Sequence, residues 1–350
     1  MSGFGLRARI KRIFRRKSHM KEKTLYIDTP PIDINQLSGK DDFQIDLELE
    51  TDDFVGTLKI RLDSDSIEWD THNGEDYFPI SCNRLIVSVK TDLDVSEAQF
   101  LENTYFLVIE YLTIFINYLK TELGQYWVDV GLIRDWDLLT FLDKTISKQI
   151  VVDEGQKISI PIGGYRKKIV FSPRRRKYPE KFIGLDVRKI QDIKSWLDEH
   201  KEPELAKLLL ADSKRLLLHS DYKSSSVFAI TAIERSLEEF IKNRCKAKGI
   251  SKNTLDTYDK NHYISDYLKL LLPLVLEPNE LTNWLETWLE SSLHWHGGKF
   301  NSNQIIEWAI QLNQARNEAV HKGITPEFET IDKGIFAVEV LYEFVKEGNK

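Results

Sequence analysis

The chain has 350 residues, of which 41% are hydrophobic and 30% are charged, and its formal net charge is −6 at pH 7. This length and apolar content fit two folded domains and exclude a chain that is disordered throughout. Ten prolines, 17 glycines and no sequence repeat exclude collagen-like and solenoid proteins.

The first 23 residues form a basic N-terminal arm. Residues 7–23 hold nine Lys or Arg against one acid, so the arm carries +8 and the rest of the chain −14. The net negative charge of the chain outside the arm does not attract a polyanion, so any nucleic-acid contacts must come from local basic clusters. Apolar residues at roughly helical spacing in the arm are also typical of a helix on a membrane surface. We favour a basic tail that orders on a partner over membrane contact; a third interpretation places the arm on its own acidic body.

Residues 24–184 alternate between apolar and polar positions in several stretches. Between 43 and 62 the pattern runs through Phe43, Ile45, Leu47 and Leu49, then resumes after a turn. Residues 84–90, 157–162 and 167–172 show the same period of two, and Gly163 and Gly164 predict a hairpin between the last pair. A helical pattern between Ser96 and Gly124 interrupts them. We therefore predict a β-rich recognition or sensor domain with antiparallel strands and an inserted helix.

A second basic cluster lies near the end of this region. Residues 166–181 contain eight bases and one acid, with Phe171 and Tyr178 between them. The cluster is either a solvated loop or an RNA-binding segment that contacts phosphates. The candidate RNA-binding residues are Arg166, Lys167, Lys168, Arg174, Arg175, Arg176 and Lys177.

From about residue 185 the apolar period becomes helical and stays so to residue 350. Helices are predicted at 187–197, 203–219, 222–248, 263–276, 279–293, 303–322 and 327–345, several closed by glycine. Tryptophans and leucines on their stripes, among them Trp284 and Trp288, are assigned to a core. The sequence thus predicts the fold class α+β, with an all-α bundle after the β-rich domain.

Signals for membranes, metals and common cofactors are missing. The most apolar stretch, Tyr105 to Leu119, is shorter than the ~20 apolar residues of a membrane span, and the N-terminus lacks the apolar part of a secretory signal. Cys82 and Cys245 match no disulfide or metal pattern, so we expect a cytoplasmic protein. No P-loop, dinucleotide or zinc-protease motif occurs, so no cofactor is expected. His294 and His296 lack further metal ligands and are interpreted as exposed imidazoles at a helix end.

The motif that carries chemistry is RNEAVHKG, residues 316–323. Arg316 is followed directly by Asn317 and, after a further four residues, by His321, at the C-terminal end of the next-to-last predicted helix. Upstream, an alanine-containing helix carries Glu234 beside its buried stripe. The alternative is a surface helix end, in which Arg316 pairs with Glu318 or Glu327 and His321 is only a cap.

This motif resembles that of the HEPN domains, many of which are metal-independent ribonucleases. Their mark is an Arg followed by Asn, Asp or His, with a His four to six residues after the Arg, near the C-terminus of an all-helical domain. The resemblance covers about residues 203–350 and implies catalytic Arg316, Asn317 and His321, with Glu234 in support. It also implies a homodimer, and roles in prokaryotic antiviral defence or as a toxin with an activator or antitoxin partner.

Helix geometry constrains how such a site assembles. Residues five apart on a continuous α-helix point about 140° away from each other, so Arg316 and His321 do not converge on one atom. Either the helix unwinds near His321 or two chains combine their motifs across a two-fold axis.

These residues suit RNA cleavage, because RNA carries its own 2′-hydroxyl nucleophile. Histidine is the side chain best suited to proton transfer near neutral pH, which favours that role for His321, and Arg316 offers two parallel donors to a phosphate. Asn317 would orient the phosphate or brace His321. The expected products are a 2′,3′-cyclic phosphate and a 5′-hydroxyl, with RNA as the substrate. The alternative function is a non-catalytic scaffold of the same fold that binds nucleic acid or a protein partner.

Overall fold

A computed structural model describes residues 21–37, 44–50, 55–61, 70–72, 75–91, 110–111, 113–128, 157–161, 185, 187–251, 264–290 and 300–348. The chain divides into two compact units: Met1–Tyr118 with Val128–Ile169 and Gly184–Glu202, and Leu119–Trp127 with Val170–Ile183 and Pro203–Lys350. The predicted domain bounds, 1–23, 24–184 and 185–350, stay predictions. Residues 1–20 of the arm, the second basic cluster, and His294 and His296 lie outside the described residues.

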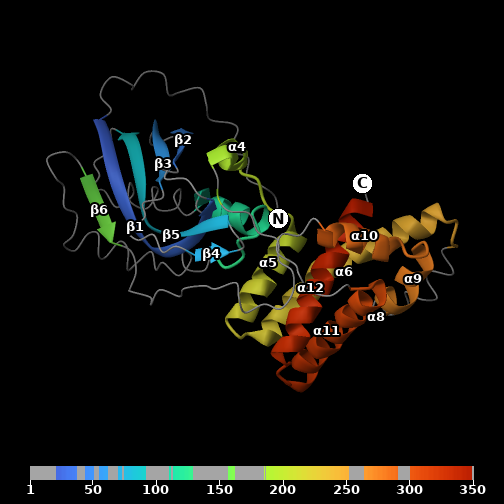
Figure 1. Cartoon of the computed structure of the whole chain (residues 1–350). Coiled ribbons are helices and arrows are strands. Elements are labelled where there is room, and N and C mark those ends of the chain that lie inside the picture. The colour runs from blue at the N-terminus through green and yellow to red at the C-terminus, as the bar shows by residue number, and fades with distance from the viewer. Residues whose placement is uncertain are drawn as a thin grey trace. The chain divides into compact units, whose positions relative to one another are not determined.

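The strands of the first unit form a mixed sheet with the order β2-β3-β5-β1-β6, and β4 pairs with β5 (Figure 1). Their bounds are β1 (Lys21–Leu37), β2 (Gln44–Glu50), β3 (Val55–Arg61), β4 (Asp70–His72), β5 (Glu75–Thr91) and β6 (Lys157–Pro161). β1 and β5 pair antiparallel from Lys21 opposite Thr91, and the register shifts between Asp28 and Ile32. Pro30 and Pro31 fall in that gap and cannot donate to a sheet ladder.

The predicted fold class, α+β with an antiparallel β-rich domain, is wrong. Helical residues far outnumber strand residues among those described, and β6 runs parallel to β1, with Thr24 opposite Lys157. β6 thus pairs with a strand far away in the sequence, and residues 162–172 of the predicted hairpin lie outside the described residues. The physical reason is that a period of two predicts an extended segment with two unlike faces, but neither its partner nor the direction of pairing.

Short helices accompany this sheet in the first unit. η4 (Val187–Lys189) leads into α4 (Ile190–Asp198), whose Ile193 and Leu197 are buried. The ring of Tyr118, in the helical stretch 113–121, meets Trp196 edge-on at 5.3 Å between centroids. Both predicted helical patterns therefore contribute aromatic or apolar side chains to packing within this unit.

The second unit is helical, as predicted for the C-terminal part of the chain. Its helices are α5 (Leu205–Leu218), α6 (Tyr222–Ala247), α8 (Ile264–Asp266), the π-helical turn η5 (Tyr267–Leu271), α9 (Leu272–Val275), α10 (Glu280–Glu290), α11 (Ser302–Lys322) and α12 (Phe328–Gly348). Local capping explains these bounds. Asp221 accepts from the N–H of Ser224 at the start of α6, and Gly249 and Gly323 take the left-handed conformation after α6 and α11.

The bundle core lies among α5, α6, α11 and α12, and α12 is its most buried helix. At Gly334 of α12, an added Cβ would lie 2.6 Å from the Cβ of Leu312 on α11, so glycine lets these two helices approach closely. Ser213 of α5 and Ser225 of α6 each donate a side-chain hydrogen bond to the other's backbone carbonyl, both at 2.8 Å. Among the described residues, no helix is both long and apolar enough to cross a membrane.

Candidate functional site at the end of helix α11

Helix α11 places Arg316, Asn317 and His321 in its last two turns. The helix begins with a capping box, in which Asn301 and Gln304 bond each other's backbone N–H groups, and it continues to Lys322. Gly323 ends it with φ of 70°, and the Nζ of Lys223 on α6 donates to the Gly323 carbonyl at 2.9 Å. The motif therefore lies where α11 ends beside the start of α6, at the lower end of the bundle in Figure 1.

Arg316 is partly buried, and its neighbour orients it. Its Nη1 donates to the Oδ1 of Asn317 at 2.9 Å, while its Nε is buried and has no hydrogen-bond partner in the described part of the chain. Among the described residues no ion pair joins Arg316 to Glu318 or Glu327, and Glu318 pairs instead with Lys322 at 3.5 Å. The guanidinium is thus held by a neutral amide, and its positive charge stays available to an anion.

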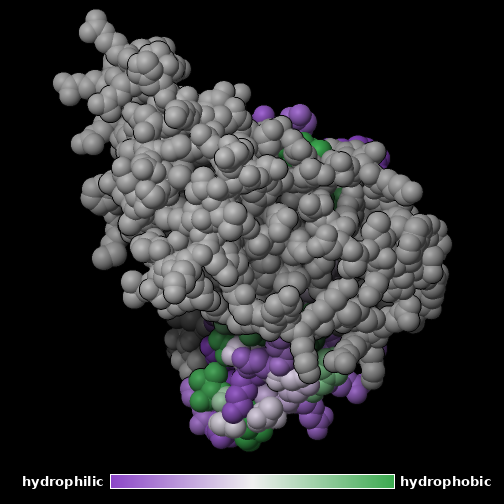
Figure 2. Space-filling model, turned by 90° about the vertical axis from the view of Figure 1, so that its left-hand side faces the viewer, coloured by the Kyte–Doolittle hydropathy of each residue, from purple (hydrophilic) through white to green (hydrophobic). Residues whose placement is uncertain are grey.

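His321 is exposed on the last turn of the helix, and no hydrogen bond or ion pair joins it to another described residue. Two apolar neighbours are also exposed, Val320 by 54% and Ile324 by 48%. Figure 2 shows hydrophobic patches between hydrophilic ones at this end of the bundle. Because α11 stays helical through Lys322, the first of the two alternatives, a helix that unwinds near His321, is not what the structure has, and Arg316 and His321 of one chain diverge.

Glu234 lies on α6, which runs antiparallel to α11. Lys223 meets Gly323 at one end; at the other, Arg244 bonds Glu280 and Thr282 bonds Ser302. Counting residues from the Lys223 contact places Glu234 about 6 Å along the axis from the level of Arg316. Glu234 is half-buried, and no ion pair joins it to Arg316 among the described contacts. Its supporting role stays a prediction.

The other predicted binding residues are not placed. All seven candidate RNA-binding residues between 166 and 177 lie outside the described residues. Within the described residues, no group of three or more His, Cys, Asp or Glu is arranged to hold a metal ion.

Sequence reasoning missed a cavity elsewhere in the second unit. Trp284, Lys214 and Glu339 are among the residues that line it. A signal for it was present, because Glu339, Glu343 and Glu347 recur every four residues and must share one face of α12. Trp284 and Trp288 have the same spacing on α10. Their assignment to the core alone overlooked that they also line this cavity.

Comparisons with known proteins return no match: no family model, no curated protein and no solved structure is similar to this chain. The likeness to HEPN domains therefore rests on the residues of the motif and on their place in a helical bundle.

Proposed function

We propose that this protein is a metal-independent endoribonuclease of the HEPN type that cleaves RNA by attack of the 2′-hydroxyl. The observation that carries the proposal is the end of α11, where Asn317 orients the guanidinium of Arg316 and His321 is exposed one turn later. A cation fixed by a neutral partner and an accessible imidazole are the minimum that such a reaction needs without a metal, once they meet in one groove.

Each side chain has a distinct role in the proposed reaction. His321 accepts the 2′-hydroxyl proton or donates a proton to the leaving 5′ oxygen. The 2′ oxygen bonds to phosphorus as the P–O5′ bond breaks, which yields a 2′,3′-cyclic phosphate and a 5′-hydroxyl. Arg316 stabilises the negative phosphorane with two parallel donors, and Asn317 keeps the fork in place.

The working site is proposed to combine two chains. Arg316 and His321 diverge on one continuous helix, whereas an isologous contact at the exposed ends of α11 brings both copies of the motif into one groove. The exposed Val320 and Ile324 supply apolar area for such a contact. Roles in antiviral defence or as a toxin, with an activator or antitoxin partner, are part of the same proposal.

The test is RNA cleavage by the purified full chain in EDTA, with wild type beside Arg316→Ala and His321→Ala. Each substitution is expected to lower the rate about 10²-fold or more. Lys322→Ala is the matched control, because it removes an exposed cation from the same turn and should leave the rate unchanged. Equal cleavage by all four proteins would refute the assignment. RNA that is bound but not cut, with or without added cell extract, would favour the scaffold function instead.

A further inference from the structure

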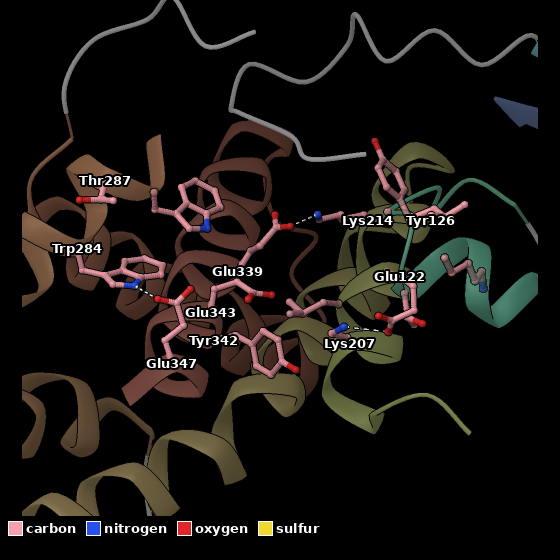
Figure 3. Close-up of a pocket in the computed structure, with 17 residues that line it drawn as sticks. Glu122, Tyr126, Lys207, Lys214, Trp284, Thr287, Glu339, Tyr342, Glu343 and Glu347 are labelled. Carbon is pink, nitrogen blue, oxygen red and sulfur yellow. Dashed lines mark hydrogen bonds and ion pairs between the residues drawn. The ribbon is translucent and has the colours of Figure 1, made fainter. Parts of the chain in front are cut away.

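A cavity of about 520 Å³ opens within the helical unit, between α5, α10, α12 and residues 120–126 (Figure 3). This volume lies in the range of small-molecule pockets, roughly 300–1,000 Å³. None of the motif residues on α11 lines this cavity.

One wall of the cavity is a row of carboxylates on α12. Glu339, Glu343 and Glu347 follow each other at intervals of four residues and all line the cavity. A helix rises 1.5 Å per residue, so successive carboxylates are about 6 Å apart along the axis. The Oε2 of Glu339 is buried and accepts no hydrogen bond in the described part of the chain.

The facing wall is aromatic. Trp284 and Trp288 of α10 stack with ring centroids 6.1 Å apart and planes inclined by 27°. The Nε1 of Trp284 donates to the Oε2 of Glu347 at 2.6 Å, which Figure 3 shows as a dashed line. The indole is neutral and does not offset the charge of Glu347, which lies at the edge of the ring, next to the electron-rich ring face. Such a face attracts organic cations.

The lysines around the cavity are held by acids. Lys207 pairs with Glu122 at 2.9 Å and Lys214 with Glu339 at 2.5 Å. Lys120 bonds Asp212 at 2.7 Å. The lining therefore offers no lysine without a carboxylate partner to an anionic ligand, and its glutamates outnumber its lysines.

Acids near Tyr342 also contribute a negative electrostatic potential inside the cavity. Burial is the largest cause that raises the pKa of Tyr342 far above 10.0, followed by its hydrogen bond to Glu204 and by the charges of Glu204, Glu343 and Glu122. Tyr342 lines the cavity, so a phenolate there would meet an excess of negative charge. The contribution of the carboxylates, unlike that of burial, favours a cation at the same place.

We propose that this cavity binds a linear aliphatic polyamine, with ammonium groups against the carboxylates of Glu343 and Glu347 and the methylene chain along Trp284 and Trp288. Two ammonium groups joined by a four-carbon chain have nearly the spacing of two carboxylates one helical turn apart. The chain needs an apolar wall, which the tryptophans provide. A hydrated divalent metal gains nothing from an apolar wall and requires a close set of oxygen ligands. No such set of ligands is formed among the described residues.

Isothermal titration calorimetry of the full chain with spermidine and putrescine tests the proposal. Wild type should bind both with saturation and should bind spermidine more tightly, while 1-aminobutane and MgCl₂ at matched ionic strength should bind at least tenfold more weakly. Magnesium that binds as tightly as spermidine, or no saturable heat with either polyamine at millimolar concentration, would overturn it.

Two variants locate the site. The double substitution Glu343→Gln with Glu347→Gln should weaken spermidine binding about tenfold or more, and Thr287→Lys should weaken it similarly by placing an ammonium group at the cavity wall. Glu286→Gln is the matched control, since this acid is exposed on α10 and does not line the cavity. Equal affinity in the variants and the control, each verified as helical by circular dichroism, would place the binding elsewhere and refute the assignment.

Discussion

The buried ion pair between Lys214 and Glu339 should contribute measurably to the stability of the helical unit, which substitution of either residue can test. Its side chains are only 8% and 16% exposed, and the Nζ of Lys214 also lies 5.5 Å from the centre of the Tyr126 ring. Removing one charge of a buried pair costs about 3–5 kcal/mol, because the other charge stays buried without compensation. Glu339→Gln keeps one hydrogen-bond acceptor, and the Tyr126 ring attracts the ammonium, so we expect the lower end, about 3 kcal/mol.

Removing both charges should restore most of that loss. In the double variant Lys214→Met with Glu339→Gln, neither charge of the pair is left buried. Its free energy of unfolding should therefore lie within about 1 kcal/mol of the wild-type value. Urea unfolding followed by tryptophan fluorescence measures this, since Trp284 and Trp288 line the same cavity as the pair. With a slope of about 2 kcal/mol/M, the single variant should lose roughly 1–2 M in midpoint. Lys322→Ala, which breaks an exposed pair, should not shift it. A double variant no more stable than the single one would refute the role of charge.

Three further predictions concern packing, pH and assembly. Gly334→Ala gains about 1 kcal/mol of helix propensity but forces a contact 2.6 Å from the Leu312 Cβ, so thermal unfolding should show a net loss of about 1–2 kcal/mol; a raised midpoint would contradict the close helix contact. The pKa of Tyr342 is raised by burial and then by Glu204, so its contribution to stability is complete below about pH 10 and is lost as pH rises above that value. Tyr342→Phe should therefore flatten the alkaline decline in urea midpoint, and an unchanged decline would exclude this tyrosine as its source. Val320→Glu, at a position 54% exposed, should convert a dimer to a monomer in light scattering and lower RNA cleavage with it, whereas a wild type that is monomeric at assay concentration would contradict the two-chain site.

The helices of the second unit were predictable because their signals are local. The predicted helix 222–248 differs from α6 (Tyr222–Ala247) by one residue, since Asp221 caps its start and Gly249 its end. The predicted helix 263–276 is instead α8, the π-helical turn η5 and α9. A π-helical turn depends on how one extra residue is accommodated by packing, and the apolar period does not encode it.

The sheet and the cavity could not be predicted for the opposite reason. The pairing of β6 with β1 joins Lys157 to Thr24, and alternation within either strand contains no information about such a partner. The cavity needs α5, α10, α12 and residues 120–126 together. Glu339 looks like a solvated acid in the sequence, whereas in the fold it is mostly buried and pairs with Lys214 of α5.

The motif and the cavity occupy different levels of the same bundle, which makes their tests independent. α12 begins at Phe328, beside the end of α11 that carries His321, and Glu339 lies eleven residues further along α12. That separation amounts to about 16 Å, beyond the roughly 10 Å within which substitutions commonly couple. Glu343→Gln with Glu347→Gln should therefore leave RNA cleavage intact in the absence of polyamine, and His321→Ala should leave spermidine binding intact. If spermidine alters cleavage by wild type but not by the cavity variant, the two sites are linked through α12, whose start adjoins the motif and whose acidic face lines the cavity. A change of the same size in both proteins would instead come from polyamine bound to the RNA.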